Sequence, residues 1–220
     1  MEELFILQEE EFQILATAMD FTDVYGICTV HTPDEASVLY AIHEMVQKGI
    51  LEKTKEGFYP APVYRTAFSN MKTAEKILAV TGKNEEVSDI CFYLGDRLIS
   101  LEESRQDKNA VKIGIYEKCE LRSLLAERGF LPEPFWEQDI AELQKEGELL
   151  LTEETVLAQY VLFSPPDKKQ EPYKSFRLLQ NGCDYRIAEK DGEAVAYAVY
   201  SAEGFWTCLE RSLGMKEVQV

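Results

Sequence analysis

Residues 111–129 read VKIGIYEKCELRSLLAERG, and residues 195–214 read VAYAVYSAEGFWTCLERSLG. Both copies begin with a V-x-(I/Y)-(G/A)-(I/V)-Y strand pattern, continue through a short polar joint and end in an amphipathic helical pattern closed by Gly. Residues upstream match more weakly, because 90–94, 95–96 and 98–102 resemble 175–179, 181–182 and 185–189. Each copy therefore predicts strand, turn, strand, turn, strand, helix.

This internal repeat, over residues 90–130 and 173–214, predicts the fold class. Two related ββ-β-α units are expected to form a pseudo-two-fold mixed or antiparallel sheet with helices packed on it, in an α+β protein. The strands at 111–116 and 195–200 are expected to be core strands related by the two-fold axis. A sheet built twice favours a scaffold for binding over a catalytic pocket. The alternative is a chance likeness between two short amphipathic units.

The first 82 residues have the element order of a winged helix. Its signals are helical spacing of apolar residues in 8–19, 34–48 and 62–78, with two short strands in 50–53 and 57–60. Thr32 and Pro33, followed by two acids, predict the start of the second helix, and Gly49 predicts its end. We therefore predict a winged-helix-like helical part over 1–82 and a sheet part over 83–220. The two parts are compatible with one continuous domain.

The segments between these units are less regular. Residues 4–7 read as a short strand or a helix lead-in, and residues 82–89 read as a polar linker. Residues 135–147 predict a helix, and the aromatic and β-branched run 156–163 favours a strand. Residues 164–172, SPPDKKQEP, predict a loop.

Composition limits the classes of partner. The 220 residues carry 40 acids and 23 Lys and Arg, a formal net charge of −17, and 45% are hydrophobic, which is enough for a sizeable core. A surface of this charge repels nucleic-acid phosphates and anionic lipid. No apolar run approaches the ~20 residues of a membrane span, and the acidic N-terminus lacks the basic region of a signal peptide. We expect a cytoplasmic protein with a basic or apolar partner, or an acidic surface that serves solubility alone.

The residues that most often carry chemistry show no familiar pattern. The five cysteines are widely spaced, with no CxxC or CxxH pair, and are expected to be buried free thiols. His31 and His43 are expected to have structural or surface roles, and with Cys28 they lack a fourth metal ligand at a known spacing. No phosphate-binding, dinucleotide-binding, HExxH, GxSxG or EF-hand motif occurs. The expectation is a protein that is not an enzyme, with no cofactor and no metal.

Nucleic-acid binding is tested by the charge of the winged-helix-like part. Residues 1–80 carry 13 acids and 6 bases, and the predicted second helix has Asp34, Glu35 and Glu44 against Lys48. A reading helix presents Arg or Lys to grooves and phosphates. We therefore expect this part to be a packing or protein-docking module and do not expect nucleic acid as a partner.

The layout resembles the EspG family, the cytosolic chaperones of type VII (ESX) secretion. The resemblance is carried by residues 36–102, in the stretches ASVLYAIHEMVQKGIL, KEGFYPAPVYRTAFSNMKTAEKILAV and DICFYLGDRLISLE. Proteins of that family show a similar order of helix, Gly-Leu, short hairpin, Pro, helix and strand, and a similar quasi-two-fold sheet. The resemblance implies a cytosolic chaperone that masks a helical, apolar tip of a secretion substrate before export. No single binding residue carries over from the family.

We therefore expect a non-enzymatic protein-binding scaffold that exposes one contiguous apolar patch on its sheet, and the resemblance implies a scaffold of this chaperone kind. The alternative is a winged-helix transcription regulator with a C-terminal sensing domain. That alternative requires a basic stripe, which the sequence lacks unless a dimer assembles it.

Overall fold

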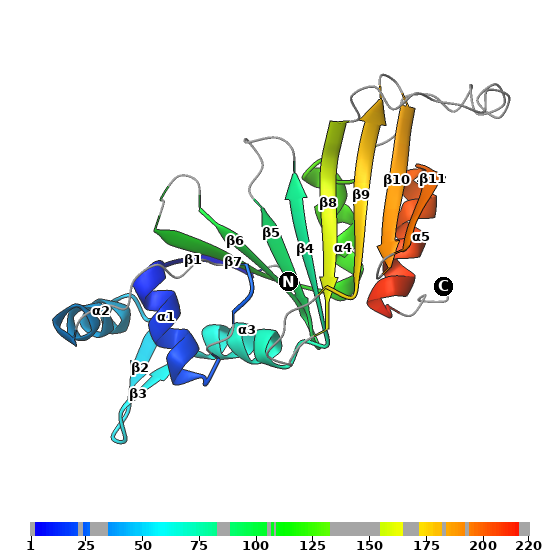
Figure 1. Ribbon diagram of the computed structural model, residues 1–220. Helices are drawn as coiled ribbons and strands as arrows, with labels where there is room; N and C mark the ends of the chain where they lie inside the picture. The colour runs from blue at the N-terminus through cyan, green and yellow to red at the C-terminus, as the bar shows by residue number, and fades with distance from the viewer. Residues whose placement is uncertain are drawn as a thin grey trace, which may run out of the picture.

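The structure is a computed structural model that describes residues 3–21, 24–26, 35–82, 89–104, 107, 109–132, 155–164, 172–181, 184–191 and 194–215. Its main element is a nine-stranded antiparallel sheet that runs across the whole molecule (Figure 1). The spatial order of the strands is β1-β7-β6-β5-β4-β8-β9-β10-β11. Their bounds are Glu3–Gln8 (β1), Lys76–Gly82 (β4), Ile90–Leu94 (β5), Leu98–Glu103 (β6), Ala110–Tyr116 (β7), Thr155–Phe163 (β8), Lys174–Asn181 (β9), Asp184–Asp191 (β10) and Ala194–Val199 (β11).

Five α-helices, one 3-10 turn and a short hairpin complete the described part of the chain. The helices are α1 (Glu9–Ala18), α2 (Glu35–Gln47), α3 (Pro62–Lys72), α4 (Leu121–Glu127, after the 3-10 turn η1, Lys118–Glu120) and α5 (Ala202–Leu213). Strands β2 (Leu51–Lys53) and β3 (Phe58–Pro60) pair with each other and form a separate two-stranded sheet. The protein is therefore an α+β fold with a large antiparallel sheet.

The sheet contains two consecutive meanders of four strands, each followed by a helix. The first is β4-β5-β6-β7 and then α4, and the second is β8-β9-β10-β11 and then α5. The two meanders join where β4 pairs antiparallel with β8, with Val80 opposite Tyr160. Each predicted unit of three strands and a helix is thus preceded by one further strand, which the sequence repeat does not include.

The two faces of the sheet belong to different hydrophobic clusters. On one face, α4 and α5 cover residues such as Leu78, Phe92 and Phe176. On the other face, α1 and α3 cover the first meander, with Phe12 and Phe68 among the buried residues. In Figure 1, α4 and α5 lie behind the strands of the second meander, and α1, α2, α3 and the β2–β3 hairpin are grouped at the opposite end of the molecule.

Two predictions about the N-terminal part change. The helix expected over 62–78 ends at Lys72, and residues 76–82 form β4. The run Ile77-Leu78-Ala79-Val80 is apolar on both faces because β4 is held between β5 and β8, so it adopts the pattern of a buried strand. Residues 4–7, left open between strand and helix lead-in, belong to strand β1. The linker predicted at 82–89 lies mostly outside the described residues, as does the helix predicted at 135–147, whereas the strand predicted at 156–163 is confirmed as β8.

The prediction that both repeated strands are core strands is half wrong. β7 is a core strand between β1 and β6, and Val111, Ile113 and Ile115 are at most 3% exposed. β11 pairs with β10 alone within the described residues, and every residue of β11 is exposed. The physical reason is position: β1 closes the edge of β7, whereas β11 is itself the edge of the sheet.

Candidate protein-binding face

Within the described residues, the candidate metal ligands named from the sequence do not come together in one site. Cys28 and His31 lie outside the described residues. His43 is exposed on α2, where its Nε2 lies 2.8 Å from Nε2 of Gln47. Among the described residues, no three His, Cys, Asp or Glu side chains gather in a group that could hold a metal ion, and none of the described helices is long and apolar enough to cross a membrane.

The described cysteines differ in their surroundings, so the expectation of buried thiols is only partly right. Cys91 is buried beneath Gly26, and burial, aided by the charge of Asp89, raises the pKa of its thiol to about 12. Such a thiol stays protonated at neutral pH and is a poor nucleophile. Cys119 is exposed at the start of the α4 segment, and Cys208 is half-buried on α5.

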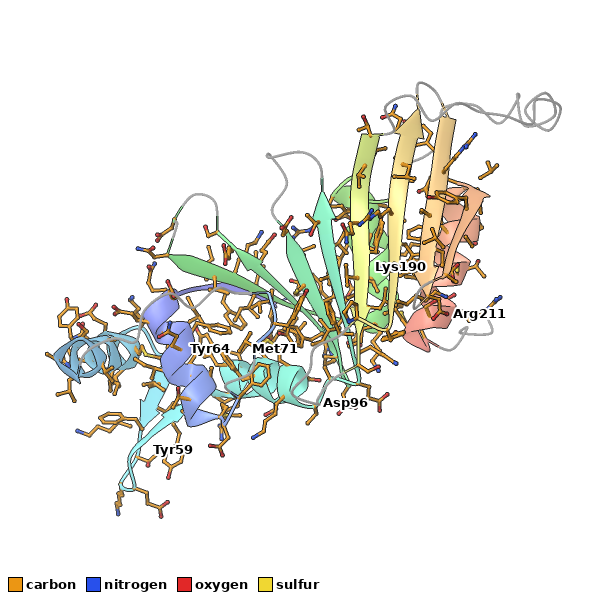
Figure 2. The ribbon with its side chains drawn as sticks, in the orientation of Figure 1. Tyr59, Tyr64, Met71, Asp96, Lys190 and Arg211 are labelled. Atoms are coloured by element: carbon orange, nitrogen blue, oxygen red, sulfur yellow. The ribbon has the colours of Figure 1, made fainter. Side chains whose placement is uncertain are left out.

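The α2 helix, which would read DNA in a winged helix, exposes apolar residues. Leu39 is 64% exposed and Tyr40 is 69% exposed, while the Nζ of Lys48 at the helix end is bound to Glu11 Oε1 at 2.8 Å. Tyr59, labelled in Figure 2, lies on the β2–β3 hairpin away from the large sheet. This end of the molecule offers aromatic and aliphatic contacts more than phosphate contacts.

The second meander has one covered face and one open face. Directly opposite residues in an antiparallel pair share a face, and Ile187 of β10, which joins the cluster under α5, lies opposite Ala198 of β11. The intervening residues therefore point away from α5. We call the surface that they form on β9, β10 and β11 the open face, and its described side chains are Ser175, Arg177, Leu179, Arg186, Ala188, Lys190, Val195, Tyr197 and Val199.

The outer part of the open face is apolar and accessible. The exposed fractions of Val195, Tyr197 and Val199 are 50%, 63% and 70%. On the same side of the sheet, α1 and α3 bury the equivalent surface of the first meander. The solvent-facing side of an antiparallel sheet normally carries polar residues. Three large apolar side chains in one exposed row are therefore typical of an interaction surface.

The open face is also basic, in a protein of net charge −17. Arg177 and Lys190 are exposed, Arg186 is half-exposed, and Figure 2 shows Lys190 on β10. None of these three cations is in an ion pair within the described part of the structure. An anionic partner is therefore attracted to this face although the rest of the molecule repels it.

Glu189 of β10 lies on the other face, where a lysine neutralises it. Glu189 lies opposite Phe176 on the α5 side, and its Oε1 is 2.5 Å from the Nζ of Lys174. The same carboxylate accepts a hydrogen bond from the thiol of Cys208 at 3.7 Å. Alternation along β10 thus places Arg186 and Lys190 on the open face and Glu189 beneath α5.

Helix α5, which covers one face of the second meander, has well-defined ends. The hydroxyl of Ser201 accepts a hydrogen bond from the backbone N–H of Gly204 at 3.1 Å, which caps the first turn. Gly214 ends the helix in the left-handed conformation, with φ of 68°. Phe205 and Trp206 of α5 are buried against the sheet.

Known proteins provide a likeness in fold alone. No protein-family model matches this chain, and no curated protein matches it in sequence. Among solved structures, the chain is similar to the type VII secretion system chaperone EspG5 of Mycobacterium tuberculosis, solved in complex with a PE25-PPE41 dimer. The likeness has a TM-score of 0.54 at 9% sequence identity, and it covers 94% of this chain and 96% of the EspG5 chain. The layout resemblance seen in the sequence is thus supported at the level of the fold.

The sequence reasoning predicted an apolar patch on the sheet but missed the cations beside it. Arg177, Arg186 and Lys190 are spread over two strands, and the chain around them also contains acids. The sequence feature that could have revealed them is the spacing of Arg186, Ala188 and Lys190 at every second residue. In a strand, this spacing places all three on one face. The register between β9 and β10 then adds Arg177 opposite Ala188.

Proposed function

We propose that this protein is a non-enzymatic scaffold that holds a protein partner on the open face of its second meander. The observation that carries the proposal is the row of exposed Val195, Tyr197 and Val199 beside Arg177, Arg186 and Lys190, three cations that form no ion pair with any other described side chain. Tyr and Arg are enriched among the residues that dominate binding energy at protein interfaces. Burial of the apolar row supplies affinity, and the cations steer an acidic partner.

In its more specific form, the proposal is a cytosolic chaperone for type VII secretion substrates. The fold likeness to EspG5, a chaperone solved with a protein dimer, supports this form. We further propose that residues 1–82, apart from the sheet strands β1 and β4, form a winged-helix-like packing part, and that the two meanders are related by a pseudo-two-fold axis between β4 and β8. The antiparallel β4–β8 pairing and the two meander-helix units support the pseudo-symmetry.

The test is affinity capture from native lysate with matched variants. Tyr197→Glu places a carboxylate in the apolar row, and Leu39→Glu is the control because Leu39 is equally exposed on α2, at 64% against 63%. We expect wild type and Leu39→Glu to retain the same partner, identified by mass spectrometry, and Tyr197→Glu to lose it. Loss in both variants, or in neither, contradicts the assignment of the open face.

The regulator alternative is tested with the same preparations. A winged-helix regulator is expected to be retained on DNA at about 50 mM salt, where phosphate contacts are strong. Retention that Lys53→Glu abolishes would replace the scaffold proposal by the regulator. We expect no retention, because α2 presents Leu39 and Tyr40 outward.

A further inference from the structure

Among the described residues, no strand pairs with the outer edge of β11. β11 pairs with β10 alone in the described part of the chain, and all six of its residues are exposed. Alternate residues of such a strand direct backbone N–H and C=O groups outward. Natural sheets block their edges with charged residues, proline or bulges, and the sequence AVAYAV contains neither charge nor proline. This edge is therefore competent to pair with another strand.

At the opposite end of the same sheet, the equivalent strand edge is paired with an additional strand. There the last strand of the first meander, β7, pairs with β1, a strand from outside the meander. The pairing is antiparallel over six residue pairs, from Glu3 opposite Ile115 to Gln8 opposite Ala110. The corresponding strand of the second meander is β11, and no described segment takes the place of β1 beside it.

Charges next to β11 define the segment that fits. On the open face, Lys190 lies opposite Val195, Ala188 opposite Tyr197 and Arg186 opposite Val199. The part of the β10 row that lies opposite β11 is therefore cation, small residue, cation. Neighbouring strands are about 4.8 Å apart, so long side chains of β10 and of an added strand can meet across β11. Acids at the two ends and an aromatic or aliphatic residue between them complement this row.

We propose that the edge of β11 binds an extended, acidic segment of the protein partner as an added strand, with the pattern acid-x-apolar-x-acid on the open face. That the segment belongs to a protein partner rests on the proposed function. The new elements are the extended conformation of the segment and its acidic charge. Main-chain hydrogen bonds supply affinity in strand addition, and alternate side chains supply selectivity.

The experiment uses the full chain and two palindromic peptides. Fluorescein-labelled TEVFVET carries the proposed pattern and reads the same in both directions, so the strand polarity does not have to be known. TKVFVKT is the charge-reversed control. We expect TEVFVET to bind at least about tenfold more tightly than TKVFVKT in fluorescence polarisation, because like charges across an interface are repulsive. We also expect bound TEVFVET to slow amide hydrogen exchange in β11.

A charge-reversed protein completes the test. Combined Arg186→Glu and Lys190→Glu is expected to invert the preference, so that TKVFVKT binds more tightly, which a misfolded variant cannot do. Lys53→Glu combined with Lys55→Glu, both exposed on the β2–β3 hairpin, is the matched control and is expected to keep the wild-type preference.

Three results would overturn the inference: equal affinity for the two peptides, binding without protection of β11, or a dimer whose β11 amides are protected before peptide is added. In the last case a second copy of the chain occupies the edge. The test of strand addition is separate from the test of the proposed function. If partner capture depends on Tyr197 but β11 is not protected, the scaffold proposal stands and strand addition is rejected. If the peptide binds but no partner is captured, strand addition stands and the scaffold proposal is rejected.

Discussion

Phe205 holds α5 against the second meander, and its removal tests whether one face of this meander is a true core. The side chain is 4% exposed. Its ring centroid lies 4.8 Å from that of Tyr160, 5.5 Å from that of Phe176 and 6.0 Å from that of Tyr200. Substitution of a buried Phe by Ala costs about 3–5 kcal/mol through lost transfer energy and the remaining cavity. Because three aromatic rings surround the site and cannot all collapse into it, we expect about 4 kcal/mol for Phe205→Ala.

The assay is urea unfolding followed by circular dichroism. With a dependence on urea of about 2.5 kcal/mol per molar, the loss lowers the midpoint by about 1.5 M. Val199→Ala is the control, because Val199 is 70% exposed on the open face and its truncation is expected to change stability by less than about 0.5 kcal/mol. A midpoint shift below about 0.4 M for Phe205→Ala, or equal shifts for the two variants, would refute the assignment of a buried and an open face.

Three further predictions concern the rest of the fold. Burial alone would raise the pKa of Glu102, but hydrogen bonds and charges from Arg128 and Lys112 lower it. The stability that the ionised Glu102 contributes is therefore present at neutral pH and is lost as the pH falls through the lowered pKa. Glu102→Gln should therefore cost about 2–4 kcal/mol in urea unfolding at pH 7 and much less at pH 3. In native alkylation followed by peptide mapping, exposed Cys119 should react rapidly and buried Cys91 only on unfolding, and equal rates would contradict the burial. Gly114→Ala should lower stability by about 1–3 kcal/mol, because a Cβ would clash with the ring of Tyr116, and a neutral change in thermal unfolding would contradict this packing.

The sequence repeat predicted the strands and helices of the two units, because short-range patterns determine them. The alternation around Ile113 and Tyr197, the cap at Ser201 and the terminal Gly214 are all local signals, and the structure has a strand or a helix at each. What the pattern cannot show is which strand becomes an edge. β7 and β11 have the same alternation, and only the pairing of β1 with β7 makes one of them a core strand.

The same limit explains the misjudged segment after α3. Ile77 continues the helical spacing of Phe68 and Met71, so the sequence favoured one long helix. The strand forms because Ile77 pairs with Tyr93 on one side and Phe163 on the other, partners that are distant in the chain. For the candidate binding face, the cations were visible as residues, but their gathering on one side depends on the β9–β10–β11 register.

Site-specific photo-crosslinking in cells that make this protein tests the central claim most directly. Benzoylphenylalanine is placed at Tyr197 on the open face or, for comparison, at Leu39 on α2, two positions of equal exposure. The account predicts a discrete crosslinked product with a protein partner from position 197 and none from position 39. A product from position 39 alone, or from neither position, would contradict a partner held on the open face of the second meander.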